Sequence, residues 1–523
     1  DCTFIGNHSA GFGAGLYFHF DVTGEVQRCT FVNNHAELEG GGSYSKATGG
    51  IHYSDCYFQG NKAVIGAGQY NFVGSSAVIE RCEFVGNVAI TGGAGTYADF
   101  ATLTVSDCSF AANEAGVGIT KGSGGGGGSG GGGVWANDST LLVQRCTFDD
   151  NLASFGGGVY TISNTQGTVQ DCTFTANHAE EAGGLYILGS HVRALRCTFI
   201  RNTALGGPFS VGGGISTYFA AGSSMERCTF DMNSSQLGGG GLYVEGESPF
   251  IEGCVFTRND SLIPPQGWGG AIMVSYFTTP YIANCSFVGN TSNRGGAIYV
   301  MVFGQPVIAN CSFAANYCGP ENTGGAIESW SFAELTTIQN CVLWGNSPLE
   351  LVGPYNAASY SDIGGFGEDF GPGVFSADPL FARTPSAGGD NQWGTEDDDL
   401  GNLSPAAGSR CIDAGDNSAM LDELVLDVVN QPRRVDDLGT SDSGPGAPPC
   451  IDVGAFEFQG LTVPACPGDA DGDGSVGLAD IAVIIMNWTE KVPRGMAGDL
   501  NRDGTVGTAD IAMVLAHWAT SCE

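Results

Sequence analysis

Basic residues are scarce in this sequence, which has 19 Lys and Arg against 55 Asp and Glu and a formal net charge of −36. A surface this acidic repels phosphate, so the composition excludes a protein whose main partner is nucleic acid. Charged residues of both signs make up only 14% of the chain, and hydrophobic residues make up 42%. That balance allows a large buried core and excludes wholesale disorder.

Long apolar runs are also missing. No stretch reaches about 18 apolar residues, so no transmembrane helix is predicted. The 85 glycines do not recur at every third position, which excludes collagen. The chain opens at Asp1 without a methionine or a signal peptide, as a processed secreted protein would, and its 18 Cys fit an oxidising environment. We therefore expect an extracellular or cell-surface location.

What the sequence does have is a cysteine repeat with a period near 26 residues. The first twelve of these cysteines are each followed by Phe two residues later and by Asn five residues later; the last has Leu343 and Asn346 at these positions. The repeated cysteines are Cys2, Cys29, Cys56, Cys82, Cys108, Cys146, Cys172, Cys197, Cys228, Cys254, Cys285, Cys311 and Cys341. Recurrence of this kind is typical of a solenoid in which each repeat forms one coil.

Short alternating segments and glycine turns, without a helical period, favour a parallel β-solenoid over residues 1–346. Thirteen coils at about 4.8 Å each predict a rod roughly 60 Å long. In Arg28-Cys29-Thr30-Phe31, period-2 alternation points Cys29 and Phe31 inward. Stacked coils then form a Phe ladder and an Asn ladder, in which Asn adopts the left-handed conformation and bonds its amide to the next coil.

Two other rows of stacked residues allow more than one interpretation. The stacked cysteines are expected to be buried thiols, with disulfides between neighbouring coils as the alternative. The residue before each cysteine alternates in charge over eight coils, from Asp1 and Arg28 to Asp171 and Arg196. We interpret this row as a network of opposite charges that fixes the register, not as a catalytic site.

Extra residues lie mainly between the Asn and the glycine pair, at 114–131, 203–212, 260–268 and 317–323. They should emerge from one edge of the rod, where insertions often form a binding face. The Gly/Ser run around Lys121 is equally consistent with a flexible loop that binds nothing.

The FxxN motifs, together with Gly270-Ala271-Ile272, Gly296-Ala297-Ile298 and Gly325-Ala326-Ile327, resemble the repeats of polymorphic outer-membrane proteins. The resemblance covers about two thirds of the chain. It implies an all-β right-handed parallel β-helix displayed outside the cell, commonly as an adhesin.

Residues 347–460 are acidic and irregular, and segments such as 403–415 and 451–457 resemble the choice-of-anchor tail that follows secreted β-helices. By this resemblance the segment caps the open end of the solenoid, whose strand edges need cover. Cys411 and Cys450 are its only cysteines and are expected to pair. The run Glu396 to Asp399 is consistent either with a calcium site or with a solvated acidic loop.

Two loops near the C-terminus place oxygen side chains at positions 1, 3, 5 and 12 and Gly at position 6, as calcium loops do. Position 7 offers its carbonyl, and each loop leads into an apolar helix. We expect two calcium ions, with the ligands Asp469, Asp471, Asp473, Ser475 and Asp480 in one loop and Asp499, Asn501, Asp503, Thr505 and Asp510 in the other.

The duplicated loop-helix over 466–522 resembles the type I dockerin family, and we assign 461–523 to this domain. The resemblance implies docking onto a cohesin-like protein through Leu478, Ala479, Thr508 and Ala509. Cys466 and Cys522 flank the module and are expected to clasp its ends. The alternative is a structural calcium module that docks on its own rod or on a neighbouring subunit.

These observations predict a secreted, non-catalytic structural or adhesive rod that could assemble head to tail into fibres. A surface glycan is a further candidate partner. The alternative function is a polysaccharide lyase or glycoside hydrolase carried by its docking module. No cluster of paired carboxylates supports it in the sequence, and the seven His show no metal or triad spacing.

Overall fold

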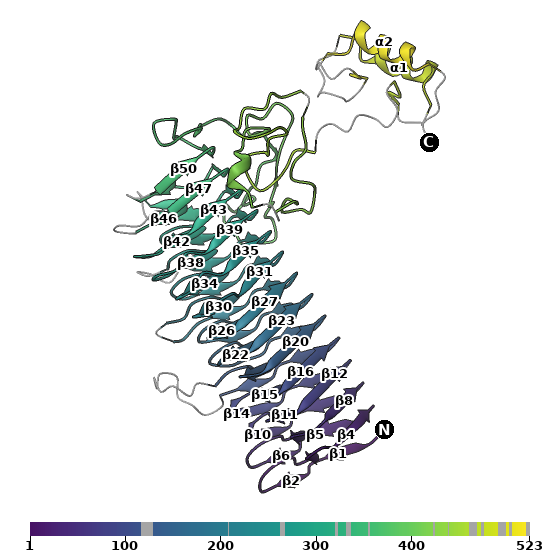
Figure 1. The fold of residues 1–523 in the computed structure, drawn as a ribbon, viewed down its shortest axis with the longest axis vertical. Helices are drawn as coiled ribbons and strands as arrows, with labels where there is room; N and C mark the ends of the chain where they lie inside the picture. Colours follow the sequence, from purple (N-terminus) through teal and green to yellow (C-terminus); the bar gives the residue numbers. More distant parts are fainter. Residues whose placement is uncertain are drawn as a thin grey trace.

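The computed structural model describes residues 1–116, 129–207, 209–261, 267–319, 323–330, 336–353, 356–421, 424–437, 439–459, 468–471, 475–489, 498–500 and 505–518. Most of these residues form a rod of stacked parallel strands, which runs from purple to teal in Figure 1. An irregular segment follows, and two short helices, α1 (Leu478–Met486) and α2 (Thr508–Ala516), come last.

One coil near the middle of the rod illustrates the repeat. It contains β24 (Thr173–Thr175), β25 (His178–Ala179), β26 (Leu185–Leu188) and β27 (His191–Leu195). Each of these strands pairs in parallel with its counterpart in the next coil. Three of the resulting sheets run the length of the rod, and the fourth is divided into two groups.

Sheet A has fourteen strands, from β1 (Thr3–Ile5) to β51 (Asp362–Ile363). Sheet C, from β3 (Leu16–His19) to β49 (Leu349–Val352), and sheet D, from β4 (Thr23–Gln27) to β50 (Asn356–Ser359), have thirteen each. Sheet B consists of two groups of short strands, β2 (His8–Ser9) to β18 (Glu114–Ala115) and β25 to β45 (Tyr317–Cys318). The motif ends at Asn346, but the sheets continue through Ile363.

The core is a set of ladders, as the period-2 pattern predicts. The phenylalanines from Phe4 to Phe313 stack with ring centroids 4.4–5.0 Å apart and planes within 9° of parallel. This spacing is that of neighbouring strands, so identical rings lie directly over one another. Phe31 and Cys29 are buried and Arg28 is exposed, which confirms the predicted faces.

The Asn ladder forms, but its predicted backbone conformation is wrong. Asn177 donates from Nδ2 to Phe148 O in the preceding coil and to Asn202 Oδ1 in the next, both at 2.9 Å. The left-handed residue is the one before each Asn, for example Ala176 with φ 51°. The Asn side chain is fully buried, so its own bonds fix the turn while its neighbour takes the unusual φ.

The predicted capping segment divides into two parts. Val374 belongs to the hydrophobic core of the rod, and Phe366 and Phe370 pack against that core. Most of the following residues lie along the side of the last coils (Figure 1). There Ala455 N donates to Ser312 Oγ at 2.8 Å and Asn284 Nδ2 donates to Leu426 O at 3.1 Å. The irregular segment therefore contacts the side of the last coils.

Candidate functional site

The first predicted calcium loop brings its described acidic ligands together. Carboxylate oxygens of Asp469, Asp471 and Asp480 lie within 4.8 Å of one another. Asp480 is buried in the first turn of α1, where it accepts from Ala470 N at 2.5 Å and Gly477 N at 2.6 Å. These bonds hold its carboxylate toward the loop, as position 12 of a calcium loop requires.

The second loop repeats this arrangement. Asp510 is buried in the first turn of α2 and accepts from Gly507 N at 2.8 Å, and Asp499 is buried nearby. Ser475 and Thr505 are exposed at position 7 of their loops. The predicted ligands Asp473, Asn501 and Asp503 lie outside the described residues.

The two loop-helix units share one small core, made of Val476, Ile484, Val506 and Val514. Each loop also opens with a glycine against the other unit's helix. A Cβ on Gly468 would come within 3.2 Å of Met513 O, and one on Gly498 within 3.1 Å of the Ile484 Cα. Each unit therefore packs its loop glycine against the helix of the other unit. Ordering one loop should thus stabilise the helix that supports the other.

The predicted partner-binding residues Leu478, Ala479, Thr508 and Ala509 are all exposed at the starts of the two helices. Large apolar side chains on the same two helices are also exposed, with Leu478 77%, Met486 81% and Leu515 58% accessible. Soluble proteins rarely leave such side chains clustered and uncovered unless they bind something.

The charge row on the rod forms ion pairs but not a continuous network. Arg28, Arg81, Arg145 and Arg196 each hold the Asp of the preceding coil through two nitrogens, as in Arg145 to Asp107, where both bonds are 2.7 Å. The row also lies at a bend and not on a strand, because Asp107 and Arg145 have φ of 54° and 51°.

The end of the charge row has a structural explanation that the sequence did not provide. From Gly253 onward the row is neutral, and there the irregular segment covers it. Asn340 donates from Nδ2 to Asp416 O at 3.0 Å and accepts from Asp416 N at 2.7 Å. A neutral amide satisfies this contact without burying a charge.

Among the described residues every cysteine is a free thiol. This agrees with the thiol interpretation of the ladder, where Cys146 N donates to Cys172 Sγ at 3.4 Å. The predicted Cys411–Cys450 disulfide is wrong in this structure, because Cys411 Sγ faces Asp362 and Cys450 Sγ faces the Gly444 carbonyl. Cys466 and Cys522 lie outside the described residues.

The acidic run offers little to a cation. Asp398 Oδ2 accepts from Gly394 N at 2.8 Å and Thr395 N at 3.1 Å, and Asp397 Oδ2 accepts from Gly389 N at 2.6 Å. Hydrogen bonds from Thr395 and backbone amides lower the pKa of Asp397. The Oδ2 atoms of Asp397 and Asp398 therefore already accept hydrogen bonds from the protein.

The outer face of sheet C carries a row that sequence reasoning missed, which we call the tyrosine strip. Its members share one strand position and occupy successive coils: Tyr17, Tyr44, Tyr70, Tyr97, Trp135, Tyr160, Tyr186, Ser216, Tyr243, Met273, Tyr299 and Glu328. The sequence signal for this row was the tyrosine that stands two residues after several of the glycine pairs. Tyr44 and Tyr70 stack at 5.3 Å, so they mainly cover each other's faces.

Carboxylates lie beside the tyrosine strip. Tyr218 OH donates to Glu181 Oε2 at 3.1 Å, and Tyr243 OH donates to Glu245 two coils further on. Burial raises the pKa of Glu181 to about 7, while bonds from Tyr218 and Tyr186 oppose that shift. A carboxyl that titrates near neutrality can serve as a general acid or base.

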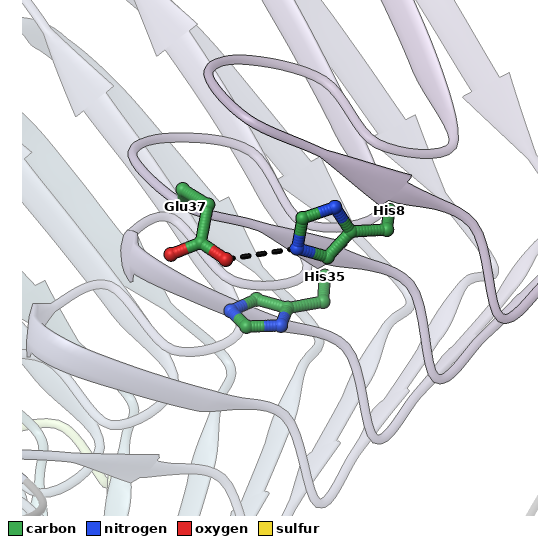
Figure 2. A group of neighbouring side chains, drawn as sticks. All are labelled: His8, His35 and Glu37. Carbon is green, nitrogen blue, oxygen red and sulfur yellow. Dashed lines mark hydrogen bonds and ion pairs between the residues drawn. The ribbon is translucent and has the colours of Figure 1, made fainter.

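A third grouping lies on the first two coils. His8 and His35 are register partners across β2 and β6 (His35–Ala36), and Glu37 follows on the same side. Figure 2 shows the three side chains converging, with His8 Nε2 bonded to Glu37 Oε1 at 2.8 Å. The seven His show no metal spacing along the sequence, but the fold places this pair side by side.

Among the described residues, no helix is both long and apolar enough to cross a bilayer. The search of curated proteins finds no match to this sequence. Residues 131–290 and 214–363 match the family model described as a right handed beta helix region. The solenoid of this chain is thus a right-handed parallel β-helix.

Proposed function

We propose that this chain is a secreted, non-catalytic rod with a structural or adhesive role, attached through a calcium-dependent, dockerin-like module at 461–523. The observation that carries the proposal is the convergence of Asp469, Asp471 and Asp480 beneath helices whose outer faces are apolar and exposed. A docking surface held in place by two ion-binding loops explains both features together.

The donor set suits calcium. Hard cations of this size take six to eight oxygen ligands, and the clustered groups offer carboxylate oxygens with no imidazole or thiolate. Calcium would be held by Asp469, Asp471, Asp473, Ser475 and Asp480 and by the matching five residues from Asp499 to Asp510. Bound calcium supplies charge compensation for carboxylates that otherwise repel one another.

The partner in this proposal is a cohesin-like protein or a neighbouring copy of the chain. It would contact Leu478, Ala479, Thr508 and Ala509, which surround the helix starts. The rod supports a structural role through its length and its uninterrupted Phe, Asn and Cys ladders, because regular stacking along one axis gives a stiff spacer.

Electron microscopy of the purified protein, with calcium and then with a chelator, tests the proposal. Filaments that fray on chelation would identify a polymer held by the module. Asp480→Asn with Asp510→Asn should reproduce the effect of the chelator, while Asp138→Asn, an exposed change at a bend of the rod, should not. Rods that remain dispersed in both conditions would oppose fibre formation and leave docking onto another protein.

A polysaccharide lyase or glycoside hydrolase is the second candidate, favoured by one observation. Glu181 has a pKa near neutrality and lies beside hydroxyl groups on an outer face of the rod. A screen for cleavage of acidic and neutral polysaccharides, with Glu181→Gln as the inactive variant, tests it. Cleavage that survives this substitution would remove Glu181 from the mechanism.

A further inference from the structure

The His8, His35 and Glu37 grouping gathers three ligand groups from two coils. One ligand atom from each residue lies within 4.8 Å of the other two, and the imidazole centroids are 5.2 Å apart. All three side chains are exposed. The Glu37 backbone is fixed, because its N–H donates to Ser9 O at 2.9 Å in the preceding coil.

The repeat explains why these residues meet. Each His directly follows a ladder residue, Asn7 or Asn34, so both occupy the same position in successive coils. Glu37 lies two residues after His35, which returns it to the same side of an extended segment. Rigid ladder contacts beneath therefore set the positions of the three groups in advance.

We propose that His8, His35 and Glu37 bind a divalent transition-metal ion, for which zinc is the reference probe. Two imidazole nitrogens and one carboxylate oxygen form the three-ligand set of open zinc sites, with water in the fourth position. Imidazole ligands favour copper, nickel and zinc over calcium and magnesium. The site is separate from the calcium loops in both position and chemistry.

Zinc binding requires the three side chains to move. Ligand atoms around a tetrahedral zinc ion lie about 3.4 Å apart, so the 2.8 Å His8–Glu37 pair must open by roughly half an ångström. The ligand nitrogen of His35, which lies within 4.8 Å of the other two ligand atoms, must adopt the same spacing. Exposed side chains can make this change by small rotations. Lys62, the register partner of His35 in the third coil, places a positive charge on the other side and should weaken the site.

Zinc titration by calorimetry of the full chain, in buffer with calcium, tests the site. We expect one zinc ion to bind at micromolar concentration, with at least tenfold weaker binding in His35→Ala and tighter binding in Lys62→Gln. His178→Ala is the matched control, because His178 occupies the same coil position but pairs with Asp150 and Thr203. Equal affinity in wild type and His35→Ala, or an equal loss in His178→Ala, would overturn the site.

A separate observation concerns the irregular segment. Carboxylate oxygens of Asp413, Asp436 and Asp442 lie within 4.8 Å of one another. Asp413 is fully buried, and its Oδ1 has no hydrogen-bond partner among the described residues. A buried carboxylate oxygen that has no hydrogen-bond partner and lies beside two other carboxylates lacks a compensating group.

The structure assigns to Asp413, Asp436 and Asp442 a calcium site of their own. Oxygen-only ligands suit this cation, and the ion would supply the partner that Asp413 Oδ1 lacks. It would also tie the exposed residues Asp436 and Asp442 to Asp413. The protein itself makes one link of this kind, because Asp437 N donates to Asp413 Oδ2 at 3.3 Å.

Calcium counting in the full chain separates this site from the terminal loops. A variant with Asn at 469, 480, 499 and 510 should retain one calcium ion, and adding Asp442→Asn should remove it. Asp390→Asn is the control, since its exposed carboxylate accepts only from Gln392 N at 2.8 Å. If the loop variant binds no calcium ion, the site at Asp413 is wrong. If the wild type and the loop variant each bind one ion, the site at Asp413 stands and the terminal loops do not bind calcium.

Discussion

At the residue scale, the Asn ladder shows why one residue type recurs. The side chain of Asn177 donates two hydrogen bonds and accepts two, from Asn151 N and Asn151 Nδ2, at complete burial. Aspartate would lack the donors, and glutamine would be too long for the same contacts. A fully satisfied buried amide stabilises the turn, whereas a partly satisfied one would destabilise it.

Asn177→Ala should therefore lower the free energy of unfolding of the rod by about 1–3 kcal/mol, because Asn151 keeps buried donors without an acceptor. Chemical denaturation followed by circular dichroism measures this change. The exposed Asn164→Asp serves as the control and should leave stability unchanged, because Asp, like Asn, tolerates the φ of 60° at this position. Equal stability of the two variants would mean that the ladder bonds contribute nothing net.

The Arg145–Asp107 pair should contribute far less, even though its two 2.7 Å bonds are well formed. Both side chains are about half exposed, with 50% and 41% accessible. Exposed pairs of this kind contribute about 0.2–1 kcal/mol. A double-mutant cycle with Arg145→Ala and Asp107→Ala measures the coupling energy. A value well above this range would show that the row is a strong stabilising device.

At the element scale, the end of a ladder needs a substitute for the missing next coil. Asn346 is the last ladder residue, and Glu350 accepts from its Nδ2 at 2.6 Å and its N at 3.2 Å. The carboxylate thus replaces the amide oxygen of a further Asn. Partial burial raises the pKa of Glu350 to about 7, while its bonds from Asn346 oppose the shift.

This shift predicts a pH dependence of stability. Because the folded state binds the Glu350 proton more tightly than the unfolded state, the contribution is complete below about pH 4.5. It is lost as pH rises to about 7 and amounts to at most roughly 3 kcal/mol. Glu350→Gln should flatten this part of the curve of unfolding free energy against pH, and the exposed Glu368→Gln should not. Identical slopes for the two variants would contradict this role.

At the scale of the whole molecule, the rod and the C-terminal module depend on different forces. The rod buries continuous apolar ladders that need no ligand. The module has only four buried apolar side chains in the core of its described residues, so we expect its acidic loops to need a bound cation to stay folded.

Chelation should therefore unfold α1 and α2 and leave the rod intact. Calorimetry should show one thermal transition that shifts down or vanishes with chelator, and a second that remains within a few degrees. Asp480→Asn with Asp510→Asn should remove the first transition even in calcium. A first transition that does not depend on calcium would show that the module folds without the ion.

The sequence by itself determined the solenoid, the inward Cys and Phe rows and the Asn ladder, whereas much of the predicted insertions at 114–131, 203–212, 260–268 and 317–323 lies outside the described residues. These features follow from a short motif that repeats at a regular interval. Because the coils stack one strand spacing apart, residues at the same position of the motif contact each other in successive coils. The same logic would have paired His8 with His35 and aligned the tyrosine strip, had every row been followed.

Only the tertiary structure decided the rest. The irregular segment has no period, so nothing in its sequence places Asp413 beside Asp436 and Asp442 or Leu426 against Asn284, 142 residues away. The repeat pattern also did not predict which residue of each turn adopts the left-handed conformation. Its neighbours decide this, and residues such as Ala176 and Arg201 adopt it. Local periodicity fixes contacts between repeats, whereas contacts between unlike segments depend on shape and on buried charge that form only when the chain is folded.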